Sequence, residues 1–191
     1  MKRIISICLV VVFVLGFVAC GGEKEGSLLS DDPSSLMFQL DGAIYTLPLS
    51  LLELETNDWE VYDPDSYFAD EVLEPGEIDV WELRNGDQNI AITFANLSEE
   101  ILLMSESHIT GFAVLAEWHS AEVVLPGNIT IGSTYEDMME VYGDMLRHIW
   151  EFENSTRFSF HTDTHFFVII VDIETNLVVY LGMDYHRSQS R

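Results

Sequence analysis

The segment His161-Thr162-Asp163-Thr164-His165 is the best candidate for chemistry in this sequence. If it is one continuous strand, His161, Asp163 and His165 point to the same face, because side chains alternate along a strand. If it is a tight hairpin turn, His161 and His165 close it as cross-strand neighbours. Either arrangement supplies two imidazoles and a carboxylate, which is half of a zinc or nickel site. The competing interpretation is a polar turn with both histidines on a solvated face.

The acidic segment 63–74, DPDSYFADEVLE, is a weaker candidate. Asp63 and Asp65 have the types of side chain that bind calcium, but the glycine and the ligand spacing of an EF-hand loop are missing. We therefore expect a solvated loop here, with a loose calcium site as the alternative.

No motif in the sequence predicts a reaction. The chain contains no G-x-S-x-G, H-E-x-x-H, P-loop or dinucleotide-binding pattern. We therefore expect a protein that is not an enzyme and that uses no cofactor. Most of the four tryptophans are expected in the core, because a sheet packed on helices needs bulky side chains.

The N-terminus has the organisation of a secretory signal peptide, which we assign to residues 1–19. Two basic residues precede an apolar run from Ile4 to Ala19. This run is shorter than the roughly 20 residues that a membrane-spanning helix needs. It ends in small residues, as a cleavage site does.

The residues at that site, Ala19-Cys20-Gly21-Gly22, resemble the lipobox of bacterial lipoproteins. Phe17 departs from the family, which usually has leucine there. The resemblance implies that a diacylglyceryl group is attached to the Cys20 thiol and that the chain is then cut before Cys20. The chain would be anchored by this lipid at the extracytoplasmic face of the cell membrane. The alternatives are a secreted protein with a free N-terminal cysteine and an uncleaved anchor.

Processing at this site would change the composition. The other cysteine, Cys8, leaves with the signal peptide, so the remaining 172 residues have no disulfide and no cysteine-based zinc or redox site. Loss of Lys2 and Arg3 takes the basic residues from eight to six and the formal charge from −25 to −27. Nucleic acid is therefore excluded as a partner, because binding it needs a basic surface. The strong negative charge is explained most simply by solubility. The functional alternative is that it attracts a cationic partner or divalent ions.

Residues 20–35 are predicted to form the lipidated end and a flexible tether, because they are rich in glycine, serine and acid. Residues 36–191 then form one domain. Residues 37–48 are predicted to form a strand pair or one bent strand, with Asp41-Gly42 as the turn. Further strands are expected near residues 80–85, 88–97, 108–118, 148–152, 157–163, 165–172 and 176–185. Their short connections predict an antiparallel sheet.

Two helices are expected between these strands. Ser50 and Glu53 have capping-box spacing, and so do Ser133 and Glu136. Gly143 is expected to end the second helix in the left-handed conformation. The apolar face of the first helix is predicted to contain Leu51, Leu52 and Trp59, and that of the second Tyr135, Met138, Met139 and Tyr142.

We therefore predict an α+β fold, with an antiparallel sheet and short helices on one face. Because each helix precedes several strands, residues 36–120 and 121–191 are predicted to be two weak copies of one repeat. The two Leu-Pro pairs do not fit the same offset as the two capping boxes.

The segment LPGNITIGSTYEDMMEVYGD, with VIIVDIETNLVVYL downstream, resembles a pattern that recurs in bacterial lipoproteins. It is similar to the small outer-membrane-assembly lipoproteins and to the repeats of β-lactamase-inhibitor proteins. The whole chain after Cys20 resembles uncharacterised lipoproteins of Gram-positive bacteria. The resemblance implies a non-catalytic protein of the cell envelope that binds another protein or has a structural role. The alternative is a lipoprotein that binds a small ligand or a metal.

Overall fold

The computed structural model describes residues 29–185, so Cys20 and most of the predicted tether lie outside the described residues. Almost all regular structure is β. The strands are β1 (Met37–Leu40), β2 (Ala43–Thr46), β3 (Leu49–Ser50), β4 (Glu60–Val61), β5 (Val72–Leu73), β6 (Ile78–Asn85), β7 (Gln88–Ala95), β8 (Leu102–Leu103), β9 (His108–Leu115), β10 (Val123–Leu125), β11 (Ile129–Thr130), β12 (Leu146–Glu151), β13 (Ser155–His161), β14 (His165–Asp172) and β15 (Val178–Tyr185). The two α-helices are α1 (Leu51–Glu55) and α2 (Tyr135–Tyr142).

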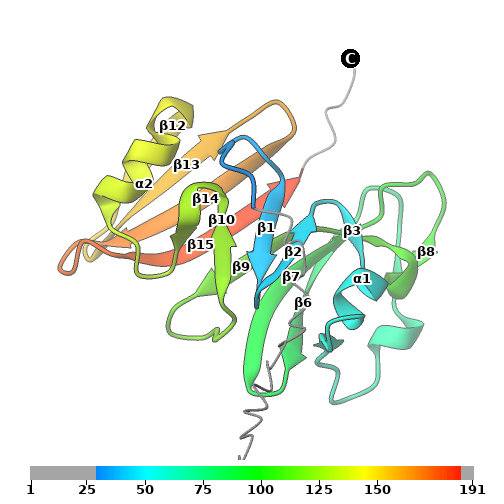
Figure 1. Cartoon of the computed structure of the whole chain (residues 1–191). Helices are drawn as coiled ribbons and strands as arrows, with labels where there is room; N and C mark the ends of the chain where they lie inside the picture. Colours follow the sequence, from blue (N-terminus) through cyan, green and yellow to red (C-terminus); the bar gives the residue numbers. More distant parts are fainter. Residues whose placement is uncertain (1–28, 186–191) are drawn as a thin grey trace, which may run out of the picture.

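The strands form one large sheet and one small sheet, both antiparallel (Figure 1). The large sheet has the order β12-β13-β14-β15-β9-β7-β6-β4, and β3 pairs with the free part of β9. The small sheet has the order β11-β10-β1-β2. Strands β5 and β8 pair separately. The predicted antiparallel arrangement is therefore confirmed.

One face of the large sheet forms the core, and the small sheet and both helices cover it. Phe38 of β1 packs against Phe112 of β9, with ring centroids 4.5 Å apart. Tyr142 of α2 lies on Phe160 and Phe167 at 5.6 and 5.3 Å. The core is built from large apolar side chains, as expected for a domain of this size without a disulfide. We call this side of the sheet the core face.

The turn between β1 and β2 confirms the strand pair predicted at residues 37–48. Asp41 and Gly42 both have positive φ, at 48° and 82°. Two consecutive residues of this kind form the hairpin turn whose twist suits neighbouring strands, and an Asp-Gly pair favours it. The turn fixes the register in which Leu40 faces Ala43.

The first helix is shorter than expected, and it buries a different face. The capping box is confirmed, because Glu53 accepts hydrogen bonds from the backbone and the hydroxyl of Ser50 at 2.8 and 2.9 Å. Leu51 and Leu54 are buried, whereas Leu52, predicted on the apolar face, is 68% exposed. The helix ends at Glu55, so Trp59 reaches the core from the segment that leads into β4.

The cap of the second helix lies one residue later than predicted. Thr134 begins the helix: its hydroxyl accepts from the amide of Asp137 at 3.1 Å and donates to the Asp137 carboxylate at 2.7 Å. The hydroxyl of Ser133 instead accepts from the amide of Thr130. The carboxylate of Glu136 accepts from the side chain of Asn176. A Ser-Thr pair offers two adjacent caps, and spacing alone did not choose between them.

Two further expectations need correction. Gly143 is right-handed, with φ −56° and ψ −37°, because the chain continues into a 3₁₀ turn. The fold class is mostly β, since the α-helices of the described residues have only five and eight residues. Neither is long and apolar enough to cross a membrane.

Candidate functional site

The structure places the segment 161–165 at the hairpin between β13 and β14. His161 pairs with Phe166, so His165 occupies the opposite face of the sheet from His161. His165 is fully buried on the core face, and its Nδ1 lies 2.8 Å from the hydroxyl of Thr162. The Nε2 of His161 lies 2.8 Å from the hydroxyl of Ser159.

The three candidate metal ligands are therefore not brought together. Asp163 is exposed in the turn, between histidines that point to opposite faces. Within residues 29–185 no three His, Cys, Asp or Glu side chains are close enough to hold a metal ion. The threonines of this segment bond to His165. The turn interpretation is therefore right about the loop, but it is wrong about His165, which is buried rather than on a solvated face.

In the acidic segment 63–74, the side chain of Asp63 forms hydrogen bonds with backbone amides of the same segment. The carboxylate of Asp63 accepts from the amides of Tyr67 and Phe68 at 3.0 and 2.7 Å. These bonds begin a short 3₁₀ turn that carries Phe68 onto the core face, where it contacts Trp81 and Phe94. The segment is a structured loop held by an aspartate cap.

The other side of the large sheet, which we call the open face, has the features of a binding surface. The strand registers define its side chains: His148 and Trp150 of β12, Arg157, Ser159 and His161 of β13, Phe166, Val168 and Ile170 of β14, Tyr180, Gly182 and Asp184 of β15, Gly111 and Ala113 of β9, Asn89, Ala91, Thr93 and Ala95 of β7, and Ile78, Val80, Glu82 and Arg84 of β6. Neither helix nor the small sheet lies on this side, because their buried residues pack on the core face.

The centre of the open face carries small residues, and this leaves a hollow. Ala95 and Gly111 are flanked by Ile78 and Val80 on β6 and by Phe166 on β14, whereas the ring of Tyr180 covers Gly182. A cavity of about 620 Å³ lies at one end of this region, bounded by the loop 96–98. A volume of this size is within the range of about 300–1,000 Å³ found for ligand pockets.

Asp184 lies in this hollow and is the only charged residue among the described residues that line it. It pairs with Gly111 across the β9–β15 interface, where a Cβ on Gly111 would overlap its Oδ1. Glycine is thus required beneath the carboxylate. Burial raises the pKa of Asp184, and a hydrogen bond from Thr93 partly opposes this shift.

The loop 96–98 is held firmly against the end of the hollow. Asn96 is buried, and its side-chain NH₂ donates to the carbonyls of Leu73 and Glu100 at 2.9 and 2.6 Å. Its Oδ1 accepts from the backbone and the hydroxyl of Ser98. Because every side-chain group of Asn96 has a protein partner, this rim is preformed.

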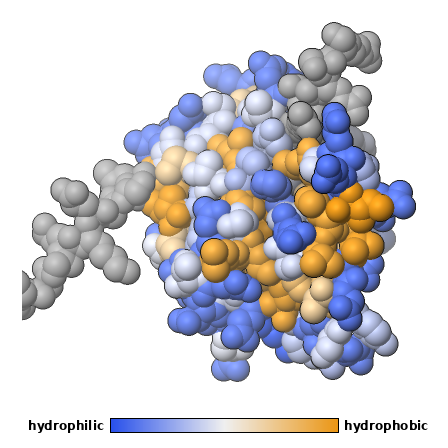
Figure 2. Space-filling model, turned by 90° about the vertical axis from the view of Figure 1, so that its right-hand side faces the viewer, coloured by the Kyte–Doolittle hydropathy of each residue, from blue (hydrophilic) through white to orange (hydrophobic). Residues whose placement is uncertain are grey.

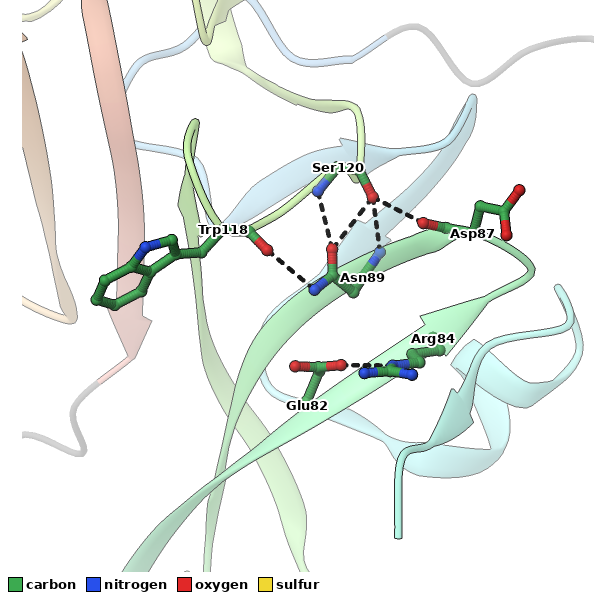
Figure 3. A network of polar contacts seen from close by, with 6 residues as sticks. All are labelled: Glu82, Arg84, Asp87, Asn89, Trp118 and Ser120. Atoms are coloured by element: carbon green, nitrogen blue, oxygen red, sulfur yellow. Dashed lines mark hydrogen bonds and ion pairs between the residues drawn. The ribbon is translucent and has the colours of Figure 1, made fainter. Parts of the chain in front are cut away.

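A polar network fixes the loop at the opposite end of the open face (Figure 3). The side chain of Asn89 donates to the carbonyl of Trp118 at 3.0 Å and accepts from the amide of Ser120 at 3.0 Å. The hydroxyl of Ser120 donates to the carbonyl of Asp87. The indole of Trp118 points away from this network and is 72% exposed. The backbone that carries this aromatic side chain is therefore rigid.

A second group of aromatic side chains lies on β12 to β14. His148 contacts both Trp150 and His161, with ring centroids at 5.4 and 6.0 Å, and His161 lies 5.8 Å from Phe166. The guanidinium of Arg157 covers the ring of Trp150 at 5.2 Å. These contacts form a continuous row that leads to the hollow.

Apolar surface is also present outside the open face. Figure 2 looks onto the end of the molecule that carries α1 and β8, where apolar and hydrophilic side chains alternate. The cross-strand neighbours Val72 and Leu103 are exposed there, as is Leu52 of α1.

Comparison with known proteins gave no match: no family model, no curated protein and no solved structure is similar to this chain.

The sequence carried signals for the hollow that our prediction did not use. Asp184 interrupts an otherwise apolar strand, and Gly111 lies inside another strand, where glycine marks a close approach. Two of the four tryptophans, Trp118 and Trp150, are exposed, although most were expected in the core. The pairing of residues 111 and 184 depends on the order of strands, which the sequence pattern does not specify.

Asp184→Asn is expected to raise the melting temperature at pH 7. The raised pKa means that the folded state disfavours the charged carboxylate, and an amide removes this cost. The gain in melting temperature should be complete at pH values above the pKa of Asp184 in the folded state. It should disappear at pH values below the pKa of an aspartate in the unfolded chain, about 3.9. Thermal melts at pH 7 and pH 3 measure it, with Asp144→Asn in an exposed turn as the matched control. A melting temperature at pH 7 equal to or below that of the parent chain would contradict the prediction.

Proposed function

We propose that this protein is a lipid-anchored protein of the cell envelope that binds a basic protein partner through the open face, without catalysis. The observation that carries the proposal is the open face itself. It presents a hollow with a preformed rim and a row of aromatic side chains in mutual contact, on the side of the sheet that carries neither of the two described α-helices. Rigid, exposed aromatic residues are typical anchors of protein interfaces.

The charge of the chain supports a basic partner. The formal net charge is −25, and no lysine or arginine occurs between Glu25 and Leu83. Such a field attracts cationic partners and raises their rate of association. The two arginines of the open face are already engaged, because Arg84 pairs with Glu82 and Arg157 lies on Trp150.

The membrane location in this proposal rests on Cys20, which lies outside the described residues. The lipobox resemblance and the apolar run before it support attachment of a diacylglyceryl group there. The domain begins at β1, so residues 20–36 separate the lipid from the folded part. A tether of this length allows the domain to move about 20 Å from the bilayer.

We also propose that the two halves of the domain are diverged copies. Strand order supports this: each half gives two strands to the small sheet, then a helix, then four strands of the large sheet in sequential order. The halves meet at equivalent antiparallel pairs, β1 with β10 and β9 with β15. The additional elements β3, β5 and β8 belong to the first half.

Site-specific photocrosslinking in the cells that make the protein tests the binding surface. A photoreactive amino acid is placed at position 80 or 150 on the open face, and at position 72 as the control. We expect positions 80 and 150 to capture the same protein, through peptides rich in lysine and arginine. Val72 is a suitable control because it is also an exposed valine in a strand, 46% exposed against 60% for Val80.

Purified partner then provides the quantitative measurement. Val80→Lys should weaken its binding about tenfold or more, because it buries a positive charge against a basic partner, while Val72→Lys should have no effect. Equal capture from position 72, or capture of acidic peptides, would exclude the proposed surface. If no protein is captured and a small molecule raises the melting temperature, the alternative of a small-ligand lipoprotein is supported instead.

A further inference from the structure

We propose that the hollow of the open face is a socket for the ammonium group of one lysine side chain of the partner, with Asp184 as its counter-ion. This inference rests on the proposed function and specifies its recognition chemistry. It derives from the position of Asp184, the single charged group among the described residues that line a cavity of about 620 Å³.

The floor of the hollow is built to hold this carboxylate. Gly111 leaves the space above β9 that the carboxylate occupies, and a Cβ there would also approach the carbonyl of Met183 to 2.7 Å. Thr93, on the next strand, supplies one hydrogen bond. Among residues 29–185, no lysine, arginine or histidine forms an ion pair with Asp184. A half-buried carboxylate without an ion-pair partner is stabilised most by a cation that a binding partner supplies.

The walls of the hollow suit the methylene part of a lysine side chain. Ile78, Val80 and Ala95 line one side, and Phe166 lies on the other. Lysine buries its four-carbon chain along apolar surface while its charged end finds a polar group. Ammonium has three donors and no fixed plane, so a single carboxylate with a neighbouring hydroxyl is sufficient. Arginine pairs best with a carboxylate whose two oxygens are both free, whereas Asp184 already accepts a hydrogen bond from Thr93. Guanidinium is the competing occupant in the test.

Other ligand classes fit the hollow less well. An anion would be repelled by Asp184, and no described residue that lines the cavity carries a positive charge. A divalent metal ion would need more oxygen or nitrogen ligands than one carboxylate supplies. The described residues contain no group of three ligands for such an ion.

Titration with small amines tests the socket directly. The probes are hexylammonium and, as a neutral molecule of similar shape, hexanol, with butylguanidinium for the arginine alternative. Binding to the purified domain is followed by NMR shifts of the amides around Thr93, Gly111 and Asp184. We expect hexylammonium to bind about tenfold or more tightly than hexanol. Asp184→Asn should remove this preference, while Asp144→Asn should retain it.

The outcomes separate this inference from the proposed function. Equal binding of hexanol and hexylammonium, or an unchanged preference in Asp184→Asn, overturns the socket. Tighter binding of butylguanidinium assigns the hollow to arginine and overturns the lysine assignment. If the amine titration overturns the socket while Asp184→Asn still crosslinks to the partner through position 80, only the socket is rejected. The open face then remains the docking surface. Circular dichroism confirms that each variant is folded.

Discussion

A chain carrying Cys20→Ser is expected to lose its lipid and to disappear from the mature, membrane-bound fraction. Lipid is attached through the thiol in the family that the lipobox resembles, and a serine hydroxyl does not replace it. Each buried methylene contributes about 0.8 kcal/mol to membrane binding, and stable anchoring takes two acyl chains. A diacylglyceryl cysteine carries two, so its loss should remove essentially all of the retention.

Cell fractionation combined with incorporation of labelled fatty acid measures this effect. The variant should accumulate either as the uncleaved precursor or as released protein, without label. Cys8→Ser is the matched control, because Cys8 lies within the apolar run and should not affect lipidation. A cleaved Cys20→Ser chain that remains with membranes as the parent does would refute the lipid anchor.

Phe112→Ala is expected to lower the free energy of unfolding by about 3–5 kcal/mol, the range typical of a buried phenylalanine. Phe112 is 2% exposed and contacts Phe38, so its ring joins the large sheet to the small one. No disulfide crosses this interface, because the domain contains no cysteine after Cys20. The loss is a large part of the roughly 5–15 kcal/mol that stabilises a typical domain.

Thermal and urea unfolding of the purified domain measure this loss. For a domain of this size the melting temperature should fall by roughly 6–20 °C, because each kcal/mol corresponds to about 2–4 °C. Ile149→Ala is the control, since Ile149 is an exposed apolar residue of the same sheet and should change stability by less than about 0.5 kcal/mol. Similar losses for the two variants would show that the sheets do not depend on this contact.

Local features of the fold could be predicted because short segments specify them. Asp41-Gly42 specified a hairpin turn, and Ser50 with Glu53 specified a helix start. Runs of apolar, β-branched and aromatic residues located the long strands, including β14 at its observed bounds. The prediction failed where two nearby residues of similar type could take the same position. Thr134 caps the second helix instead of Ser133, and Leu54 of the first helix is buried instead of Leu52.

The candidate site was less accessible to sequence analysis, because it depends on contacts between distant segments. Gly111 and Asp184 are 73 positions apart and meet only because β9 lies beside β15. Conversely, His161 and His165 are close in sequence, but the pleat of the sheet places them on opposite faces. Spacing along the chain was therefore a poor guide to proximity at both positions.

The position of β15 has a consequence for how the chain folds. β15 is the last strand of the described residues, yet it lies in the middle of the large sheet, between β14 and β9. Until it arrives, β9 presents an unpaired strand edge, which favours aggregation. Pairing between such distant segments also forms slowly. The strands of the first half therefore cannot complete the large sheet until the residues of β15 are available to pair with β9.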